Sequence, residues 1–122
     1  VEYWLNRIDL HSMRTKKAGV LSYGQQRALE IGLAMALNPE LLLLDEPTAG
    51  MSPGETSSTV DLIKTLTKGK TLLIVEHDME VVFNLADRIS VLHYGEIIAT
   101  GPPEDIKQNY QVKDVYLGGV VE

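Results

Sequence analysis

The chain has 122 residues, of which 44% are apolar and 23% are charged, and this balance is typical of one globular domain with a modest core. Its net charge of -6 disfavours binding to nucleic acid or to an anionic membrane surface, because both repel a negative protein. The absence of cysteine excludes a disulfide scaffold and any thiolate metal site. No apolar run approaches the length of a membrane-spanning helix.

The first third of the chain predicts two helices. Residues 3–10 place apolar side chains at roughly helical spacing, and a basic loop follows. Ser22 and Gln25 have the spacing of a capping box, which begins a second helix, and Asn38-Pro39 ends it. The residues between these signals leave almost no polar face, so we expect this helix to be buried nearly all round. The chain begins with Val rather than Met, which we interpret as a sign of a fragment.

A run of four leucines at residues 41–44 predicts a strand. It is bounded by Pro39 and Pro47, and a wholly apolar run of this length is typical of a strand buried on both faces of a parallel sheet. Asp45 and Glu46 follow at its carboxyl end, the edge at which ligands bind in open α/β sheets. Adjacent acids there suit a hydrated Mg²⁺ on a nucleotide phosphate and a base beside it.

The middle of the chain continues the alternation of strands and helices. Ser52 and Glu55 form a second capping box, which begins a helix that Lys68-Gly69 ends. Residues 71–75 predict a second buried strand, and Asp78 is placed to cap the short helix that follows it. This alternation predicts an α/β fold with mainly parallel strands and flanking helices.

The last third predicts a β-hairpin and small helices. Residues 89–93 and 97–100 read as the two strands of the hairpin, and Gly101-Pro102-Pro103-Glu104 opens a small helix. A last helix around residues 112–117 is expected to close at Gly118-Gly119. With no repeat and no interdomain linker, the chain is expected to form a single domain.

Three motifs together resemble those of the ATP-binding cassette (ABC) ATPases. Residues 21–26, Leu-Ser-Tyr-Gly-Gln-Gln, resemble the signature motif, residues 41–46 resemble the Walker B strand, and His77 resembles the switch histidine. Each motif is short, but their order and spacing fit the predicted elements. The resemblance implies a partial P-loop NTPase-like fold. Residues 1–38 would be the end of a helical subdomain and the signature helix, and residues 39–122 would run from Walker B to the carboxyl terminus.

For the signature motif, the resemblance implies phosphate binding between two subunits. Ser22 and Gly24 would contact the γ-phosphate of ATP held by the other subunit, and Gln25 would support them. A plain capping role for Ser22 is compatible with this, because a helix start offers N–H groups and a positive dipole to a phosphate. Tyr23 stands where many family members have Gly, which is also familiar in the branched-chain amino acid class.

For the second and third motifs, the resemblance implies catalytic roles. Asp45 would hold Mg²⁺ through water, Glu46 would act as general base or orient the attacking water, and His77 would contact the γ-phosphate. Without the resemblance, two strand-end acids would more simply cap or solvate a turn. Residues 49–52 would form the dimer-contacting loop, with Ser52 where an Asp is common in the family.

The chain lacks the phosphate-binding half of such an ATPase. Gly69-Lys70-Thr71 imitates the end of a phosphate-binding loop, but Lys64 stands where the loop needs Gly, and the tripeptide ends a helix and opens a strand. No glutamine precedes Gln25, so the family's glutamine loop is missing too. We expect the isolated chain to have no ATPase activity and weak or no binding of ATP. We also expect a strand to be missing between the Walker B strand and the switch strand, so that these either pair directly or self-associate through the gap.

The resemblance as a whole implies a fragment of the ATP-hydrolysing subunit of an ABC importer, with ATP and Mg²⁺ as ligands of the complete subunit. Residues 76–79 and the ending at residues 116–119 favour the branched-chain amino acid class. Its partners would be a second ATPase subunit and membrane permease subunits, at the cytoplasmic face of the cell membrane. A truncated, non-catalytic module that self-associates or binds a partner is the alternative. A DNA-repair type of cassette is disfavoured by the acidic balance.

Overall fold

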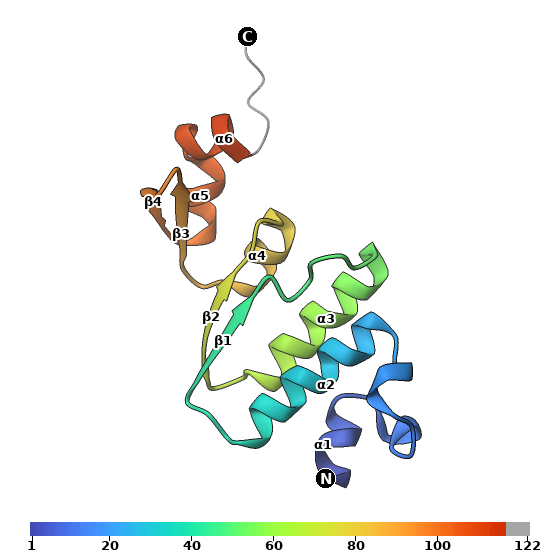
Figure 1. The fold of residues 1–122 in the computed structure, drawn as a ribbon. Helices are drawn as coiled ribbons and strands as arrows, with labels where there is room; N and C mark the ends of the chain where they lie inside the picture. The colour runs from blue at the N-terminus through green and yellow to red at the C-terminus, as the bar shows by residue number, and fades with distance from the viewer. Residues whose placement is uncertain (117–122) are drawn as a thin grey trace. The chain divides into compact units, whose positions relative to one another are not determined.

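The structure is a computed structural model that describes residues 1–116 (Figure 1). In chain order its elements are α1 (Glu2–Arg7), the 3₁₀ turns η1 (His11–Met13) and η2 (Ala18–Val20), α2 (Tyr23–Ala36), β1 (Leu41–Asp45), α3 (Pro53–Leu66), β2 (Thr71–Val75), α4 (Met79–Leu85), β3 (Ile89–His93), β4 (Glu96–Gly101), α5 (Pro103–Gln108) and α6 (Tyr110–Tyr116). The chain divides into two compact units, Val1–Val81 and a second unit that begins at Val82. None of the helices within residues 1–116 has the length and apolar character needed to cross a lipid bilayer.

The two long helices begin where their capping boxes predict. At the start of α2, the hydroxyl of Ser22 accepts from the backbone N–H of Gln25, whose side chain accepts in return from the N–H of Ser22. At the start of α3, Ser52 and Glu55 make the same reciprocal pair. Each box satisfies two backbone N–H groups that the first turn of a helix leaves unpaired. The predicted starts of both helices are therefore confirmed.

Strands β1 and β2 are direct neighbours in a two-stranded parallel sheet. Leu41 lies opposite Thr71 at one end of the pair and Asp45 lies opposite Val75 at the other. One further bond, from the N–H of Glu46 to the carbonyl of Val75 at 2.8 Å, extends the pairing past the strand ends. Direct pairing is one of the two outcomes expected from the sequence, and it brings the carboxyl ends of both strands to the same place.

The prediction that the leucine strand is buried on both faces is wrong. Side chains alternate along a strand, so every second leucine of β1 faces the same way. Leu42 is only 5% exposed, whereas Leu43 is 63% exposed, and Leu73 opposite it on β2 is 60% exposed. Figure 1 shows α2 and α3 on one side of the β1–β2 pair. The other face has no covering layer within Val1–Val81, and a parallel sheet is buried on both faces only when helices cover both.

The prediction that α2 is buried nearly all round is wrong for the same reason. Its buried residues are Ile31, Gly32 and Met35, which form one stripe against the rest of the unit. Leu33, on the opposite side, is 63% exposed. The apolar sequence of the helix anticipates two packed faces, but within Val1–Val81 only one of them has a partner.

The core of the first unit lies between α2, α3 and the inner face of the sheet. Its buried apolar residues are Ile8, Leu10, Leu21, Ile31, Met35, Leu42, Val60, Ile63, Leu66 and Val81. The chain after α1 packs closely on α2, because a Cβ on Gly32 would lie 2.9 Å from two methyl groups of Ile8. Glycine is required at this position by that close approach.

The second unit contains the predicted hairpin and small helices. β3 and β4 pair antiparallel with a bulge between Val91 and Leu92. Tyr94 and Gly95 both have positive φ, which suits the tight turn between twisted strands. α5 begins at Pro103, as predicted, and α6 contributes Val112, which is fully buried. The predicted end of the last helix at Gly118-Gly119 lies outside the described residues.

Candidate functional site

The direct pairing of β1 with β2 places Glu46 and His77 beside each other. Each residue comes at the carboxyl end of its strand, and the carboxyl ends of parallel strands meet at one edge of the sheet. The Oε1 atom of Glu46 lies 3.3 Å from the Nδ1 atom of His77. The side chains are 50% and 72% exposed, respectively, so both are open to a ligand from outside. This geometry suits a base and a phosphate-contacting imidazole that act on one substrate.

Asp45 ends β1 at the same edge. It lies opposite Val75 in the strand register and its side chain is exposed. A carboxylate is a suitable oxygen ligand for Mg²⁺. Within residues 1–116, however, no three His, Cys, Asp or Glu residues are grouped so that they could hold a metal ion. Asp45 could therefore supply one ligand to such an ion, and residues 1–116 do not provide a complete metal site by themselves.

The backbone of Glu46 adopts a left-handed conformation, with φ of 42°. A residue other than glycine rarely adopts this conformation, and it persists only where neighbouring contacts hold it. The turn after Glu46 is held by Thr48, whose N–H and hydroxyl both donate to Oε1 of Glu76, at 3.0 and 2.7 Å. Thr48 is only 7% exposed. Sequence reasoning does not predict this pair of hydrogen bonds, although the shared location of both residues at strand ends is a signal for it.

The signature residues form a separate cluster at the start of α2. The hydroxyl of Ser22 lies 3.3 Å from the N–H of Gln25, and the N–H of Ser22 lies 3.0 Å from Oε1 of Gln25. Within residues 1–116, no hydrogen bond or ion pair joins this cluster to Glu46 or His77. The structure thus brings together Glu46 and His77, but it leaves the signature residues at another place in the same unit.

The start of α2 lies close to the start of α3. A Cβ on Gly24 would lie 3.5 Å from the carboxylate of Glu55, which is an ordinary van der Waals contact, so the acid lies directly beside the start of α2. The backbone N–H and the hydroxyl of Ser52 donate to Glu55 and lower the pKa of its carboxyl group below the ordinary value. The Glu55 side chain is therefore ionised at neutral pH, which is favourable at the amino-terminal end of a helix.

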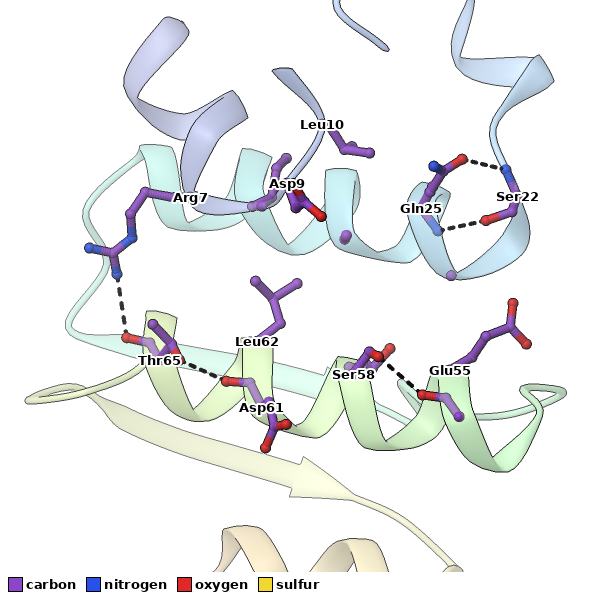
Figure 2. Close-up of a pocket in the computed structure, with 15 residues that line it drawn as sticks. Arg7, Asp9, Leu10, Ser22, Gln25, Glu55, Ser58, Asp61, Leu62 and Thr65 are labelled. Carbon is purple, nitrogen blue, oxygen red and sulfur yellow. Dashed lines mark hydrogen bonds between the residues drawn. The ribbon is translucent and has the colours of Figure 1, made fainter. Parts of the chain in front are cut away.

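A cavity of about 530 Å³ lies between the loop after α1, the start of α2 and α3 (Figure 2). Ser22, Gly24 and Gln25 line one end of it. Its charged lining consists of three acids, Asp9, Glu55 and Asp61, and one base, Arg7. Nη2 of Arg7 is already used in a hydrogen bond to the carbonyl of Thr65, at 3.4 Å. A net negative cavity repels phosphate, so a phosphate that reaches Ser22 has to come from outside this cavity.

Residues 49–52, the predicted dimer-contacting loop, connect β1 to α3. Gly50 has φ of 75°, a conformation that favours glycine. The thioether of Met51 accepts from the hydroxyl of Thr59, and Ser52 caps α3. Both side chains thus support the local fold. The dimer contact itself stays a prediction.

Gly69-Lys70-Thr71 does not form a phosphate-binding loop. It follows the end of α3 and opens β2, which is the reverse of the strand-to-helix order that such a loop needs. The Nζ atom of Lys70 donates to the side chain of Asn38 at 2.7 Å. This bond holds the ammonium group at the amino-terminal end of the sheet, away from Glu46 and His77. The rejection of this tripeptide as a phosphate cradle is consistent with the structure.

Two family models match the chain. One, described as "ABC transporter", matches residues 1–49, and the other, described as "Branched-chain amino acid ATP-binding cassette transporter", matches residues 96–122. The two matches fall at opposite ends of the chain, and they agree on the type of protein.

Individual relatives agree with these models. The chain is 44% identical over 117 residues to the high-affinity branched-chain amino acid transport ATP-binding protein LivG of Salmonella typhimurium, covering 94% of this chain and 46% of LivG. It is 42% identical over 118 residues to the corresponding protein BraF of Pseudomonas aeruginosa, covering 95% of this chain and 46% of BraF. The chain therefore spans about half the length of the curated relatives that it matches.

A solved structure extends the likeness to the fold. The ADP conformation of MJ1267, an ATP-binding cassette of an ABC transporter, matches with a TM-score of 0.82 and 34% identity over 96% of this chain and 48% of that one. The direct pairing of β1 with β2 is one of the two outcomes that we expected, and the absence of a strand from between them stays a prediction. The chain belongs to the ABC transporter ATPase family, and it resembles the branched-chain amino acid class of that family.

Proposed function

We propose that the chain is the carboxyl-terminal part of the ATP-hydrolysing subunit of an ABC importer of the branched-chain amino acid class. The observation that carries this proposal is the 3.3 Å approach of Glu46 to His77 at the carboxyl edge of a parallel sheet, with Asp45 at the same edge. The names of LivG and BraF, branched-chain amino acid transport ATP-binding proteins, support the substrate class.

In this function, Glu46 prepares the attacking water. Its exposed carboxylate accepts a proton from the water or orients it toward the γ-phosphate of ATP. His77, at 3.3 Å from Glu46, donates to the γ-phosphate oxygens and keeps phosphate and water in line. The strand pairing fixes the backbones that carry both residues, so little reorganisation is needed when the substrate binds.

Asp45 would contribute to a Mg²⁺ site through water, and nucleotide phosphates and water would supply the other ligands. When bound, this ion neutralises charge on the phosphates. The start of α2 would serve a second subunit: Ser22 and Gly24, supported by Gln25, would contact the γ-phosphate of ATP held by that subunit. The separation of this cluster from the edge that carries Glu46 supports action between subunits.

The 122 residues contain no phosphate-binding loop, so Asp45, Glu46 and His77 have no cradle for the phosphates on which they act. Phosphoryl transfer depends mainly on positioning and on charge stabilisation. We therefore propose that the isolated chain is inactive. In the complete subunit it would work on the cytoplasmic face of the cell membrane, with a second ATPase subunit and with membrane permease subunits.

A hybrid cassette tests this proposal. The part of LivG that this chain does not match, which we expect to include the phosphate-binding loop, is joined to this chain in place of the part that it matches. We expect the hybrid to release phosphate from MgATP and the 122-residue chain to release none above background. A folded hybrid without activity, checked beside intact LivG as the positive control, would contradict the proposed function.

A second candidate function, a non-catalytic module that self-associates, is favoured by the uncovered face of the sheet. Four apolar side chains are exposed there by 51–63%: Leu41, Leu43, Leu73 and Val75. Within residues 1–116 the sheet consists of these two strands, so each of them has an edge that no other strand of this part of the chain covers. Exposed apolar faces and unpaired strand edges are sites of association.

The self-association can be measured by size-exclusion chromatography with light scattering on the 122-residue chain. We expect the wild type to form dimers or larger species at micromolar concentration and Leu73→Lys to remain monomeric, because a charge on the uncovered face opposes its burial. Val20→Lys, at a residue that is 65% exposed in η2 rather than on the sheet, is the matched control and should associate like the wild type. A monomeric wild type would refute self-association.

A further inference from the structure

The turn after β1 carries backbone strain directly at Glu46. Its φ of 42° costs about 1 kcal/mol or more for a residue with a side chain. Such a conformation persists only where the surrounding contacts determine it. The contacts that hold this turn therefore decide where the Glu46 carboxylate points.

Three backbone bonds hold the turn from within. The N–H of Glu46 donates to the carbonyl of Val75 at 2.8 Å, and the N–H of Ala49 donates to the carbonyl of Glu46 at 3.1 Å. The first bond ties Glu46 to the end of β2, and the second closes the turn on itself. A third bond runs from the N–H of Met51 to the carbonyl of Thr48 at 3.2 Å. None of the three restrains the N–H or the hydroxyl of Thr48.

The carboxylate of Glu76 fixes Thr48. Its Oε1 atom accepts from both the N–H and the hydroxyl of Thr48, and hydrogen bonds to a carboxylate are stronger than those between neutral groups. Glu76 immediately precedes His77, so the residue that holds the turn of Glu46 also sets the start of the segment that carries the histidine. The Glu76 side chain thus links the turn that carries Glu46 to the segment that carries His77.

The other carboxylate oxygen of Glu76 makes no such bond. Its Oε2 atom is buried and has no hydrogen-bond partner among residues 1–116. An unpaired buried oxygen of this kind is unfavourable, and a group that bonded Thr48 without it would give a more stable fold. Among residues 1–116, the hydrogen bonds of this carboxylate are therefore the two that it accepts from Thr48.

We propose that Glu76 is a positioning residue that, through Thr48, holds the strained turn of Glu46 at the distance from His77 that catalysis needs. The proposal rests on the proposed ATPase function. Glu76 does not contact the substrate in it; its carboxylate determines the position of a residue that does.

The first test uses the 122-residue chain and needs no activity. Glu76→Ala and Thr48→Val are each compared with the wild type by NMR, through the amide signal of Glu46 and the ring signals of His77. We expect both variants to shift both sets of signals, and the matched control Glu40→Ala, an exposed acid before β1, to shift neither. Unchanged signals in folded variants would overturn the proposal even if the chain proves to have another function.

The second test uses the hybrid cassette. We expect Glu76→Ala and Thr48→Val each to lower kcat by about 10- to 100-fold with little change in KM, because misplacing a reacting group by about 1 Å has effects of this size. The double variant should lose no more than either single variant, since both break the same link. Glu76→Gln keeps an oxygen for Thr48 and should retain most of the activity.

The outcomes of the two tests separate the two proposals. A hybrid without ATPase activity, together with shifted NMR signals, would refute the proposed function and leave the link between Thr48 and Glu76 in place. An active hybrid in which Glu76→Ala keeps kcat within about 2-fold of the wild type would overturn the positioning role alone. Additive losses in the double variant would also overturn it, because they would show two independent effects.

Discussion

Replacing Glu46 by glutamine is expected to lower the turnover of the hybrid cassette by about 10²- to 10⁴-fold, the usual contribution of a general acid or base. Glutamine has the same length and keeps an oxygen that can face His77, which lies 3.3 Å from the carboxylate. It cannot take a proton from the attacking water. Phosphate release measured over a range of MgATP concentrations should show a lower kcat and a nearly unchanged KM.

The matched control for this variant is Glu40→Gln. Glu40 is an exposed acid that directly precedes β1, whereas Glu46 directly follows it. The control therefore removes the same charge at the end of the strand away from His77. The control should keep full activity. A Glu46→Gln hybrid that hydrolyses ATP within about 10-fold of the wild type would show that Glu46 is not the base, since that loss is smaller than proton transfer contributes.

Truncation of Ile63 to alanine is expected to have the largest effect on stability, a loss of about 2–5 kcal/mol in the free energy of unfolding. Ile63 is fully buried in α3, and the cavity left by its side chain cannot be filled by solvent or by relaxation of a close-packed core. Domains have a total stability of only about 5–15 kcal/mol, so this variant should lose a large share of its stability.

Urea unfolding followed by circular dichroism at 222 nm measures this loss in the 122-residue chain. Leu33→Ala is the control, because Leu33 also lies in a long helix but is 63% exposed, and its truncation should change stability by about 0.5 kcal/mol or less. Similar losses in both variants would mean that the first unit does not have the one-sided core described above.

The helix starts and strand positions could be predicted from the sequence because their signals are local. The capping box of Ser22 and Gln25 and the run of leucines in β1 lie within a few residues of the features that they specify. The exposure of Leu43 and Leu33 could not be predicted in this way. Their exposure depends on whether another layer covers them, and that layer is not encoded in their own segment.

The candidate site was predictable as a set of residues but not as an arrangement. The sequence places Glu46 and His77 after two strands, but the order of strands in a sheet depends on long-range pairing, so the sequence left open whether these two strands pair directly. The hydrogen bonds between Thr48 and Glu76 are even harder to predict from the sequence, because they depend on the conformation of two loops. A positive φ at Glu46 has no local sequence signal either.

The proposed function gives this chain the catalytic edge of an ATPase without the loop that holds the phosphates, and phosphate release by the purified 122-residue chain tests this proposal most directly. The wild type and Glu46→Gln are each incubated with MgATP, with the hybrid cassette as the positive control. We expect both isolated chains to match the protein-free background. Hydrolysis by the isolated wild type that disappears in Glu46→Gln would contradict this, because it would show that these residues position and cleave ATP by themselves.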